Sequence, residues 1–434
     1  MERSMPSSWL RRFCLVPLLL VLILISGCSK SGERTTQIEF WTLQLTPEFT
    51  DYFLKVIAAY EESHSGVTVK WVDVPYDAAV QKLLAAVAAG NPPDVVNLSS
   101  NFLSKFYSFG ALMKLNGRLP DSARTSYLPN AMKNGVYSTD TVALPWYLNT
   151  YVLIYNNQML REAGFSGRDV PQTFDGMVLF ARRFKDMSGK FAFFLNIGKD
   201  SFLPMVLESE GIHLISADGS RAIFNSPEGV AAVEKWVRLF RDGYLPRETV
   251  SGRASSLIEP YMSGQVASVF TGPVFLGRVR ANAPAIYDVT GTVPALVGKT
   301  GESELAVMSI SIMATTKHPR EAVDFALYVT NAENQLAFSK IVTTYPSVTS
   351  ALDDPFFTKD DGTPETHARV TGAKELPTAK RLRTYFAIPD YDMLTEAFDE
   401  AIQTACLDNM STKDALDRAA GRWNAILRSQ RQRQ

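Results

Sequence analysis

Hydrophobic positions in the first part of the chain change their period from two to about 3.6 and back again. Short alternating or uniformly apolar runs predict β-strands at 38–41, 67–71 and 94–98. Between them, apolar residues at helical spacing predict helices at 49–60 and 80–87. This order is typical of βαβ units with a parallel sheet, and such sheets bind ligands beyond the carboxyl ends of their strands.

A second α/β region follows residue 146, and the C-terminal part of the chain is mainly helical. No repeat with a period of about 20–50 residues is present, which disfavours a solenoid or a propeller. Strands are expected at 151–155, 191–195, 266–270 and 305–314, and the strongest helices at 174–184 and 227–240.

The N-terminus carries a processing signal. Three arginines precede an uncharged run over 13–25, which is about 20 Å long as a helix and too short for a bilayer core of roughly 30 Å. Small residues end the run before Cys28, and this pattern resembles the lipobox of bacterial lipoproteins. We expect a signal peptide at 1–27, a lipid anchor on Cys28, a tether at 28–36, and a protein facing the periplasm or the outside. The alternative is an ordinary secretory signal with a chance cysteine.

The composition mainly excludes certain partners and kinds of site. The chain has 44 Lys+Arg against 45 Asp+Glu, so its formal net charge is -1. Nucleic-acid binders carry a basic stripe, and we therefore expect no nucleic-acid partner. Three cysteines cannot form a disulfide framework, and Cys406 is expected in the core. The four histidines form no zinc motif, and we expect neither a metal nor a cofactor.

A series of sequence blocks carries a family resemblance. The blocks are IEFWT at 38, VTVKWVDVPY at 67, KLLAAVAAGNPPDVVNL at 82, ALPWYLNTYVLIYNNQMLREAG at 143, SPEGVAAVEKWVRLFRDGYLP at 226 and KHPREAVDFALYVTNAENQ at 317. In this order they are similar to the family 1 extracellular solute-binding proteins, the sugar-binding receptors of bacterial ABC importers, related to maltose-binding protein. The similarity extends over nearly the whole mature chain.

The resemblance implies an α/β fold of the type II periplasmic-binding-protein kind, with two lobes, a hinge and a ligand cleft between them. It also implies a carbohydrate ligand, ABC permease subunits as partners, and a monomer. The chain is expected to cross between the lobes near 147–152, 287–294 and 343–346. Lobe one would then hold 37–147 and 292–340, and lobe two 151–288 and 346–427.

A sugar site needs hydrogen-bonding side chains for paired hydroxyls and a flat aromatic ring for the C–H face. Strand carboxyl ends and the expected hinge offer both kinds of residue: Trp41, Thr42, Ser99, Ser100, Asn101, Trp146, Tyr147 and Asn149, the last matching a ligand-contact position of the family. In lobe two, the candidates are Asn196 and Asp200 after a strand end, and, from loops that approach the cleft in relatives, Tyr345, Tyr391 and Asp392. For Trp41 and Trp146 the alternative is a core position, and for Asp200 a solvated loop.

One segment departs from the family pattern. After the strand at 266–270, relatives often have Gly-Pro-Trp, whose tryptophan stacks on sugar. Here the chain reads Gly272-Pro273-Val274-Phe275, and Phe275 is the candidate replacement for the stacking ring.

Two other functions stay open at this stage. A secreted carbohydrate-active enzyme needs two carboxylates about 5–10 Å apart, which a sequence with many acids cannot exclude. A ligand-sensing lipoprotein would present its complex to a sensor instead of an importer, and its residues would not differ from those of a transport receptor.

Overall fold

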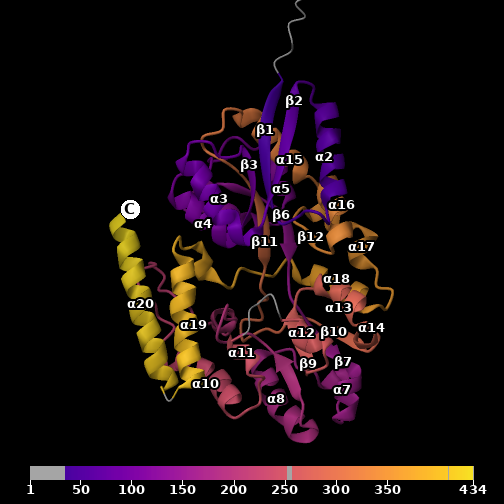
Figure 1. The fold of residues 1–434 in the computed structure, drawn as a ribbon, viewed down its shortest axis with the longest axis vertical. Helices are drawn as coiled ribbons and strands as arrows, with labels where there is room; N and C mark the ends of the chain where they lie inside the picture. The colour runs from indigo at the N-terminus through magenta and orange to yellow at the C-terminus, as the bar shows by residue number, and fades with distance from the viewer. Residues whose placement is uncertain (1–34, 252–256, 409, 434) are drawn as a thin grey trace, which may run out of the picture.

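Two β-sheets, one in each of two lobes, organise the part of the chain that the structure describes (Figure 1). The structure is a computed structural model that describes residues 35–251, 257–408 and 410–433. The expected signal peptide, the expected lipidation site Cys28 and most of the expected tether lie outside the described residues.

The first lobe, at the top of Figure 1, is built on a six-stranded sheet in the order β12-β6-β11-β3-β1-β2. β1 pairs in parallel with β2 and β3, which confirms the βαβ units expected from the sequence, whereas β11 is antiparallel to β3 and β6. The strands are β1 (Thr36–Leu43), β2 (Val67–Val74), β3 (Val95–Ser99), β6 (Ala143–Asn149), β11 (Ala306–Ile312) and β12 (Tyr345–Pro346).

Helices cover both faces of this sheet because side chains alternate between the faces along each strand. In β1, Ile38 and Phe40 belong to one hydrophobic cluster, while Trp41 and Leu43 pack in another. The first cluster includes residues of α2 (Thr50–Ser63), α15 (Pro319–Val329) and α16 (Ala332–Val342), and the second residues of α3 (Tyr76–Ala88) and α4 (Ser100–Ser108). A small hairpin, β4 (Val136–Tyr137) and β5 (Asp140–Thr141), lies beside them.

The second lobe contains a four-stranded sheet in the order β10-β7-β9-β8. Its strands are β7 (Val152–Asn156), β8 (Phe191–Phe194), β9 (Val266–Thr271) and β10 (Thr290–Val293). The helices of this lobe include α7 (Asn157–Glu162), α8 (Phe174–Ser188), α9 (Leu203–Ser209), α10 (Pro227–Arg241), α12 (Glu259–Met262), α13 (Phe275–Asn282) and α14 (Pro284–Tyr287). The long helices α19 (Tyr391–Leu407) and α20 (Thr412–Arg433) run side by side along its flank (Figure 1) and share its core through buried Phe398 and Trp423.

The chain passes between the two sheets close to the expected places, with two differences. β6 leads directly to β7 through residues 150–151, inside the expected first crossing. The return begins later than expected, since β10 pairs with β7 and so keeps residues 290–293 in the second sheet. The segment expected as the third crossing contains β12, which pairs with β6 of the first sheet.

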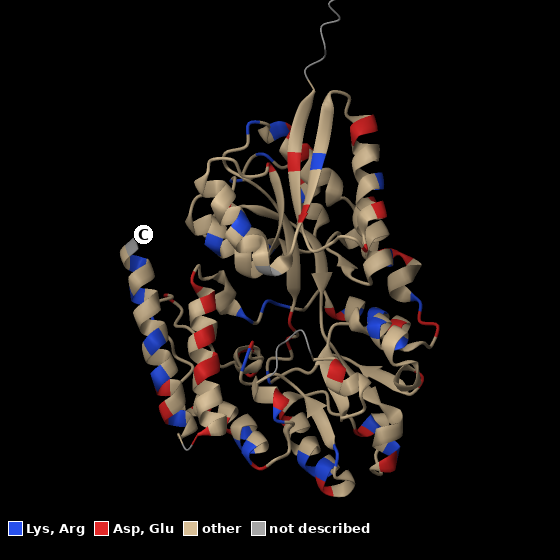
Figure 2. Ribbon diagram, in the orientation of Figure 1, with Lys and Arg blue, Asp and Glu red and all other residues tan. Residues whose placement is uncertain are grey.

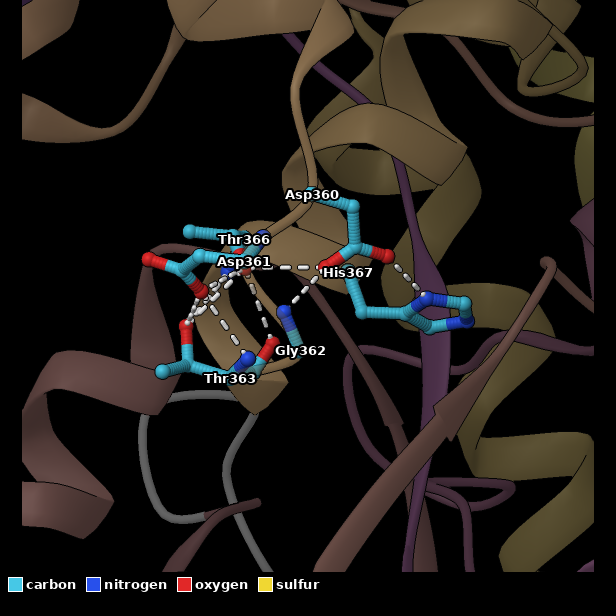
Figure 3. A network of polar contacts seen from close by, with 6 residues as sticks. All are labelled: Asp360, Asp361, Gly362, Thr363, Thr366 and His367. Carbon is cyan, nitrogen blue, oxygen red and sulfur yellow. Dashed lines mark hydrogen bonds and ion pairs between the residues drawn. The ribbon is translucent and has the colours of Figure 1, made fainter.

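The remaining connection runs through α17 (Pro355–Thr358), α18 (Pro364–Glu375) and the short helix η5 (Thr384–Ala387) before α19. A polar network fixes the start of α18 (Figure 3). Asp361 accepts hydrogen bonds from the Thr363 amide (3.0 Å) and from the hydroxyls of Thr363 and Thr366, and these bonds lower the pKa of Asp361 to about 2. His367 lies 2.7 Å from Asp360, so the network joins loop and helix.

No helix in the described parts of the chain combines the length and the apolarity that a membrane span needs.

Candidate functional site

A cavity of about 470 Å³ lies where the two lobes meet, at the carboxyl end of β3. This volume falls in the range of small-molecule sites, and the position is the one that ligands take in open α/β sheets. Its walls are formed by Tyr76, Ser99, Ser100, Asn101, Phe102, Asn149, Asp200, Ser201, Glu304, Leu305, Ala306, Val307, Met308, Arg381, Arg383, Tyr385, Phe386, Tyr391 and Thr395.

The first-lobe wall is formed by the turn from β3 into α4, where the sequence changes from apolar to hydroxyl and amide side chains. Ser99 donates a hydrogen bond to the Asn101 side-chain oxygen, and Tyr76 donates to Ser99 at 3.2 Å. Ser100 donates to the carbonyl of Val307 at 3.1 Å, which ties the turn to β11. This wall therefore offers polar groups held in place by their neighbours, with the ring of Tyr76 beside them.

The opposite wall comes from the loop after β8 and from the connection between α18 and α19. Asp200 has a left-handed backbone with φ of 47°, and its amide donates to the Asp399 carboxylate at 2.7 Å. Burial raises the pKa of Asp399 to about 7 although two backbone amides bond to it. Left-handed backbone is uncommon for residues other than glycine, and the bond to Asp399 holds Asp200 in this conformation on the cavity wall.

Side chains of α4 join the two walls directly. Asn101 donates to the hydroxyl of Tyr391 at 3.1 Å, and Ser104 donates to the carbonyl of Phe386 at 2.9 Å. Lys105 forms an ion pair with Asp392 at 3.2 Å. Burial raises the pKa of Tyr391 to about 12, so this phenol stays neutral and can donate to a ligand at physiological pH.

A buried ion pair lies at the base of the cavity. One Glu304 oxygen accepts from Arg383 at 3.3 Å and the other from the Leu382 amide at 2.7 Å, while Arg383 also donates to the Tyr151 hydroxyl at 3.0 Å. The Glu304 side chain is 3% exposed, and burial raises the pKa of its carboxyl against the opposing effect of Arg383. The pair connects the segment before β11 to the α18–α19 connection.

The structure brings six of the residues expected from the sequence to this cavity: Ser99, Ser100, Asn101, Asn149, Asp200 and Tyr391. Asp392 lies beside them and lines an adjoining cavity of about 400 Å³ together with Asp200 and Tyr391. Tyr147 and Phe275 do not line the main cavity, since the first packs against the core of the first lobe and the second against that of the second lobe.

Four residues that we expected to contact the ligand are fully buried, so these predictions are corrected. The Trp146 ring stacks on Phe338 at 5.2 Å inside the first-lobe core, and Thr42 bonds to Asp73 and Trp71 below the surface. Tyr345 is fully buried, with its hydroxyl bonded to the Arg369 carbonyl. Asn196 is fully buried as well, and neither side-chain atom has a hydrogen-bond partner.

Trp41 is also placed away from the cavity. It is half-buried against the cluster of α3 and α4, and its indole donates to Glu39 at 2.6 Å. The core alternative therefore describes Trp41 better than a stacking role does.

Several lining residues escaped the sequence analysis. Tyr76 follows the end of β2, so the strand-end rule that found Ser99 would have found it too. Arg381, Arg383 and Tyr385 belong to a connection with no strand or clear periodicity to place it. Their one signal is the cluster of basic residues at 380–383.

Other cavities lack this position between the lobes. One of about 300 Å³ lies between α19 and α20. One of about 910 Å³ lies between residues 208–223 of the second lobe and the α18–α19 connection, and Arg381 lines it as well as the main cavity. Within 35–251, 257–408 and 410–433, no group of three or more His, Cys, Asp and Glu is arranged to hold a metal ion.

The fold agrees with what related proteins show. A family model described as bacterial extracellular solute-binding protein matches residues 55–365. The galactooligosaccharide-binding protein of Bacillus subtilis (strain 168) is 23% identical over 405 residues, which cover 91% of this chain and 90% of that protein.

Solved structures show the same two-lobed architecture of type II sugar-binding proteins. A periplasmic-binding protein from Synechococcus sp. MITs9220, for which an oligosaccharide ligand has been suggested, has a TM-score of 0.83 and 33% identity, with 90% of this chain and 99% of that chain covered. The sugar-binding protein MalE of Xanthomonas citri has a TM-score of 0.78 at 19% identity, covering 91% and 98%. The chain therefore belongs to the bacterial extracellular solute-binding protein family.

Proposed function

We propose that the protein is a receptor that captures a carbohydrate between its two lobes and delivers it to the permease of an ABC importer. The observation that carries the proposal is the cavity between the lobes, with hydroxyl and amide groups on one wall and Tyr385, Phe386 and Tyr391 on the other. Hydroxyls and amides suit sugar hydroxyls, and aromatic rings suit a sugar's C–H face.

The relatives support the ligand class. The Bacillus subtilis relative is named for galactooligosaccharides, and the Xanthomonas citri structure for sugar binding. The family consists of binding proteins, which favours a receptor over an enzyme. We further propose that the mature protein begins at a lipidated Cys28 and acts as a monomer. We also propose that it divides into lobes at three crossings, near 150–151, between β10 and β11, and between β12 and α19.

A thermal-shift screen of mono- and oligosaccharides against residues 29–434 tests the proposal. A ligand at a hundredfold excess over Kd stabilises the folded state by about 2.7 kcal/mol, so a true ligand raises the melting temperature clearly. Hits are then incubated with the protein for hours and examined by mass spectrometry, and intact sugar is expected. Cleavage products would identify an enzyme, and the absence of any carbohydrate hit would contradict the proposed ligand class.

A further inference from the structure

The connection between α18 and α19 carries a basic cluster, Lys380, Arg381 and Arg383, and passes between the two lobes (Figure 2). Lys380 pairs with Glu302, and Arg383 pairs with Glu304. Two of the three cations are therefore neutralised by carboxylates two residues apart on the segment that leads into β11.

Arg381 differs from its neighbours. None of the ion pairs between described residues includes it, and its Nη1 is buried without a hydrogen-bond partner. Its guanidinium lies beside the hydroxyl of Tyr137, which donates to the Ser100 carbonyl at 3.3 Å. Arginine stays charged in proteins, and a buried donor without a hydrogen-bond partner is costly. Arg381 is thus a charged donor on the cavity wall with unused capacity.

The carboxylates of the cavity do not supply that partner. Glu304 accepts hydrogen bonds from Arg383 and from the Leu382 amide, and no described ion pair joins it to Arg381. Asp200 also lines the cavity, and no described ion pair joins it to Arg381. An ionised carboxylate accepts hydrogen bonds only, which suits the hydroxyls of a sugar, whereas the planar guanidinium fork suits a carboxylate or a phosphate.

Among the described residues that line the cavity, Arg381 is therefore a cation without an ion pair, and Asp200 is a carboxylate without one. We propose that the carbohydrate taken by this cavity carries an anionic group, a carboxylate or a phosphate, that pairs with Arg381. The proposal rests on the proposed function and specifies its ligand class. The sugar ring and its hydroxyls meet the turn at Ser99–Asn101, Asp200 and the aromatic wall, and the anionic group meets the α18–α19 connection.

Calorimetric titration with matched probes tests the pairing. The probes are galactose, galacturonate and galactose 6-phosphate, the corresponding glucose series, and neutral and uronic acid trisaccharides. We expect at least one acidic probe to bind ten times more tightly than its neutral parent, because charge-assisted hydrogen bonds are about twice as strong as neutral ones. The carboxylate and phosphate arms distinguish the two sources of negative charge.

Substitution of Arg381 shows whether the preference for an acidic probe depends on this side chain or on the rest of the cavity. In Arg381→Gln the preference for the acidic probe should disappear, while in Arg381→Lys, which keeps the charge but loses the fork, part of it should remain. Arg124→Gln is the matched control, since Arg124 is exposed and pairs only with Asp121. Melting temperatures of all variants report whether they are folded.

The outcomes show whether the anion pairing with Arg381 or the proposed function as a carbohydrate receptor is wrong. Neutral sugars that bind as tightly as their acids, a preference that survives Arg381→Gln, or no binding of any probe would overturn the inference. If neutral sugars bind as tightly as their acids, the proposed function as a carbohydrate receptor is still supported. Arg381-dependent binding of citrate or inorganic phosphate without binding of any sugar would instead overturn the proposed function and leave the anion pairing in place.

Discussion

Glu304→Gln should destabilise the protein strongly, because it removes the negative charge from a buried ion pair. The glutamine fills the same space, but one of its two terminal atoms becomes a donor facing either Arg383 or the Leu382 amide, both of which are donors themselves. Arg383 would then be a cation without a carboxylate partner, and it would keep its bond to Tyr151 and its contacts with the rings of Phe202 and Phe386.

The size of the loss follows from the burial of the pair. Breaking a buried ion pair by removing one partner costs about 3–5 kcal/mol. Arg383 keeps its bond to Tyr151, and its side chain is 18% exposed, so we expect the lower end of that range. Urea unfolding followed by circular dichroism measures the free energy of unfolding directly.

The chain offers a matched control two residues away. Glu302 pairs with Lys380 as Glu304 pairs with Arg383, but the Glu302 and Lys380 side chains are 29% and 61% exposed. A surface pair contributes about 0–1 kcal/mol, so Glu302→Gln should cost little. Equal losses in Glu302→Gln and Glu304→Gln would refute the idea that burial makes the second pair important.

Three further predictions concern the core, pH and the contact between the lobes. Trp146→Ala should lower the free energy of unfolding by about 3–5 kcal/mol because the ring is fully buried on Phe338, and a loss below about 1 kcal/mol in urea unfolding would contradict its core position. Burial raises the pKa of Asp399 to about 7, above an unfolded value near 3.9, so the folded state holds its proton longer and stability should fall as pH rises from about 4 to about 7. Urea unfolding at pH 5 and pH 8 should show a smaller pH dependence for Asp399→Asn than for the natural chain, and an equal dependence would rule the group out as its source. Tyr391→Phe should weaken sugar binding in calorimetry about fivefold by removing a hydrogen bond worth about 1 kcal/mol, whereas Ser108→Ala, at an exposed hydroxyl, should leave it unchanged, and equal effects would count against a role for Tyr391.

The hydrophobic pattern of the sequence was sufficient to predict the strands that show it. The alternation and apolar runs that predict strands at 38–41, 67–71 and 94–98 correspond to β1, β2 and β3. The rule that ligands lie beyond strand carboxyl ends then led to Ser99, Ser100 and Asn101, which do line the cavity.

Where the predictions from the sequence were wrong or incomplete, the position of the side chain depends on packing between segments far apart in the chain. Trp146 lies in β6, near the crossing between the lobes, yet Phe338, far along the chain, covers its ring. Arg381 and Arg383 reach the cavity through an irregular connection whose path depends on pairing with residues 302–304. Neither the cover over Trp146 nor this pairing has a periodic signal in the sequence, because both arise only when distant segments meet.

The central claim is that a carbohydrate binds in the cavity between the two lobes. Hydrogen–deuterium exchange with and without the tightest sugar from the thermal-shift screen tests it most directly. We predict slower exchange on both walls, at the turn 99–102 and along 381–391, with no change at the cavity between α19 and α20. Protection confined to α19 and α20, or to one lobe alone, would contradict capture between the lobes.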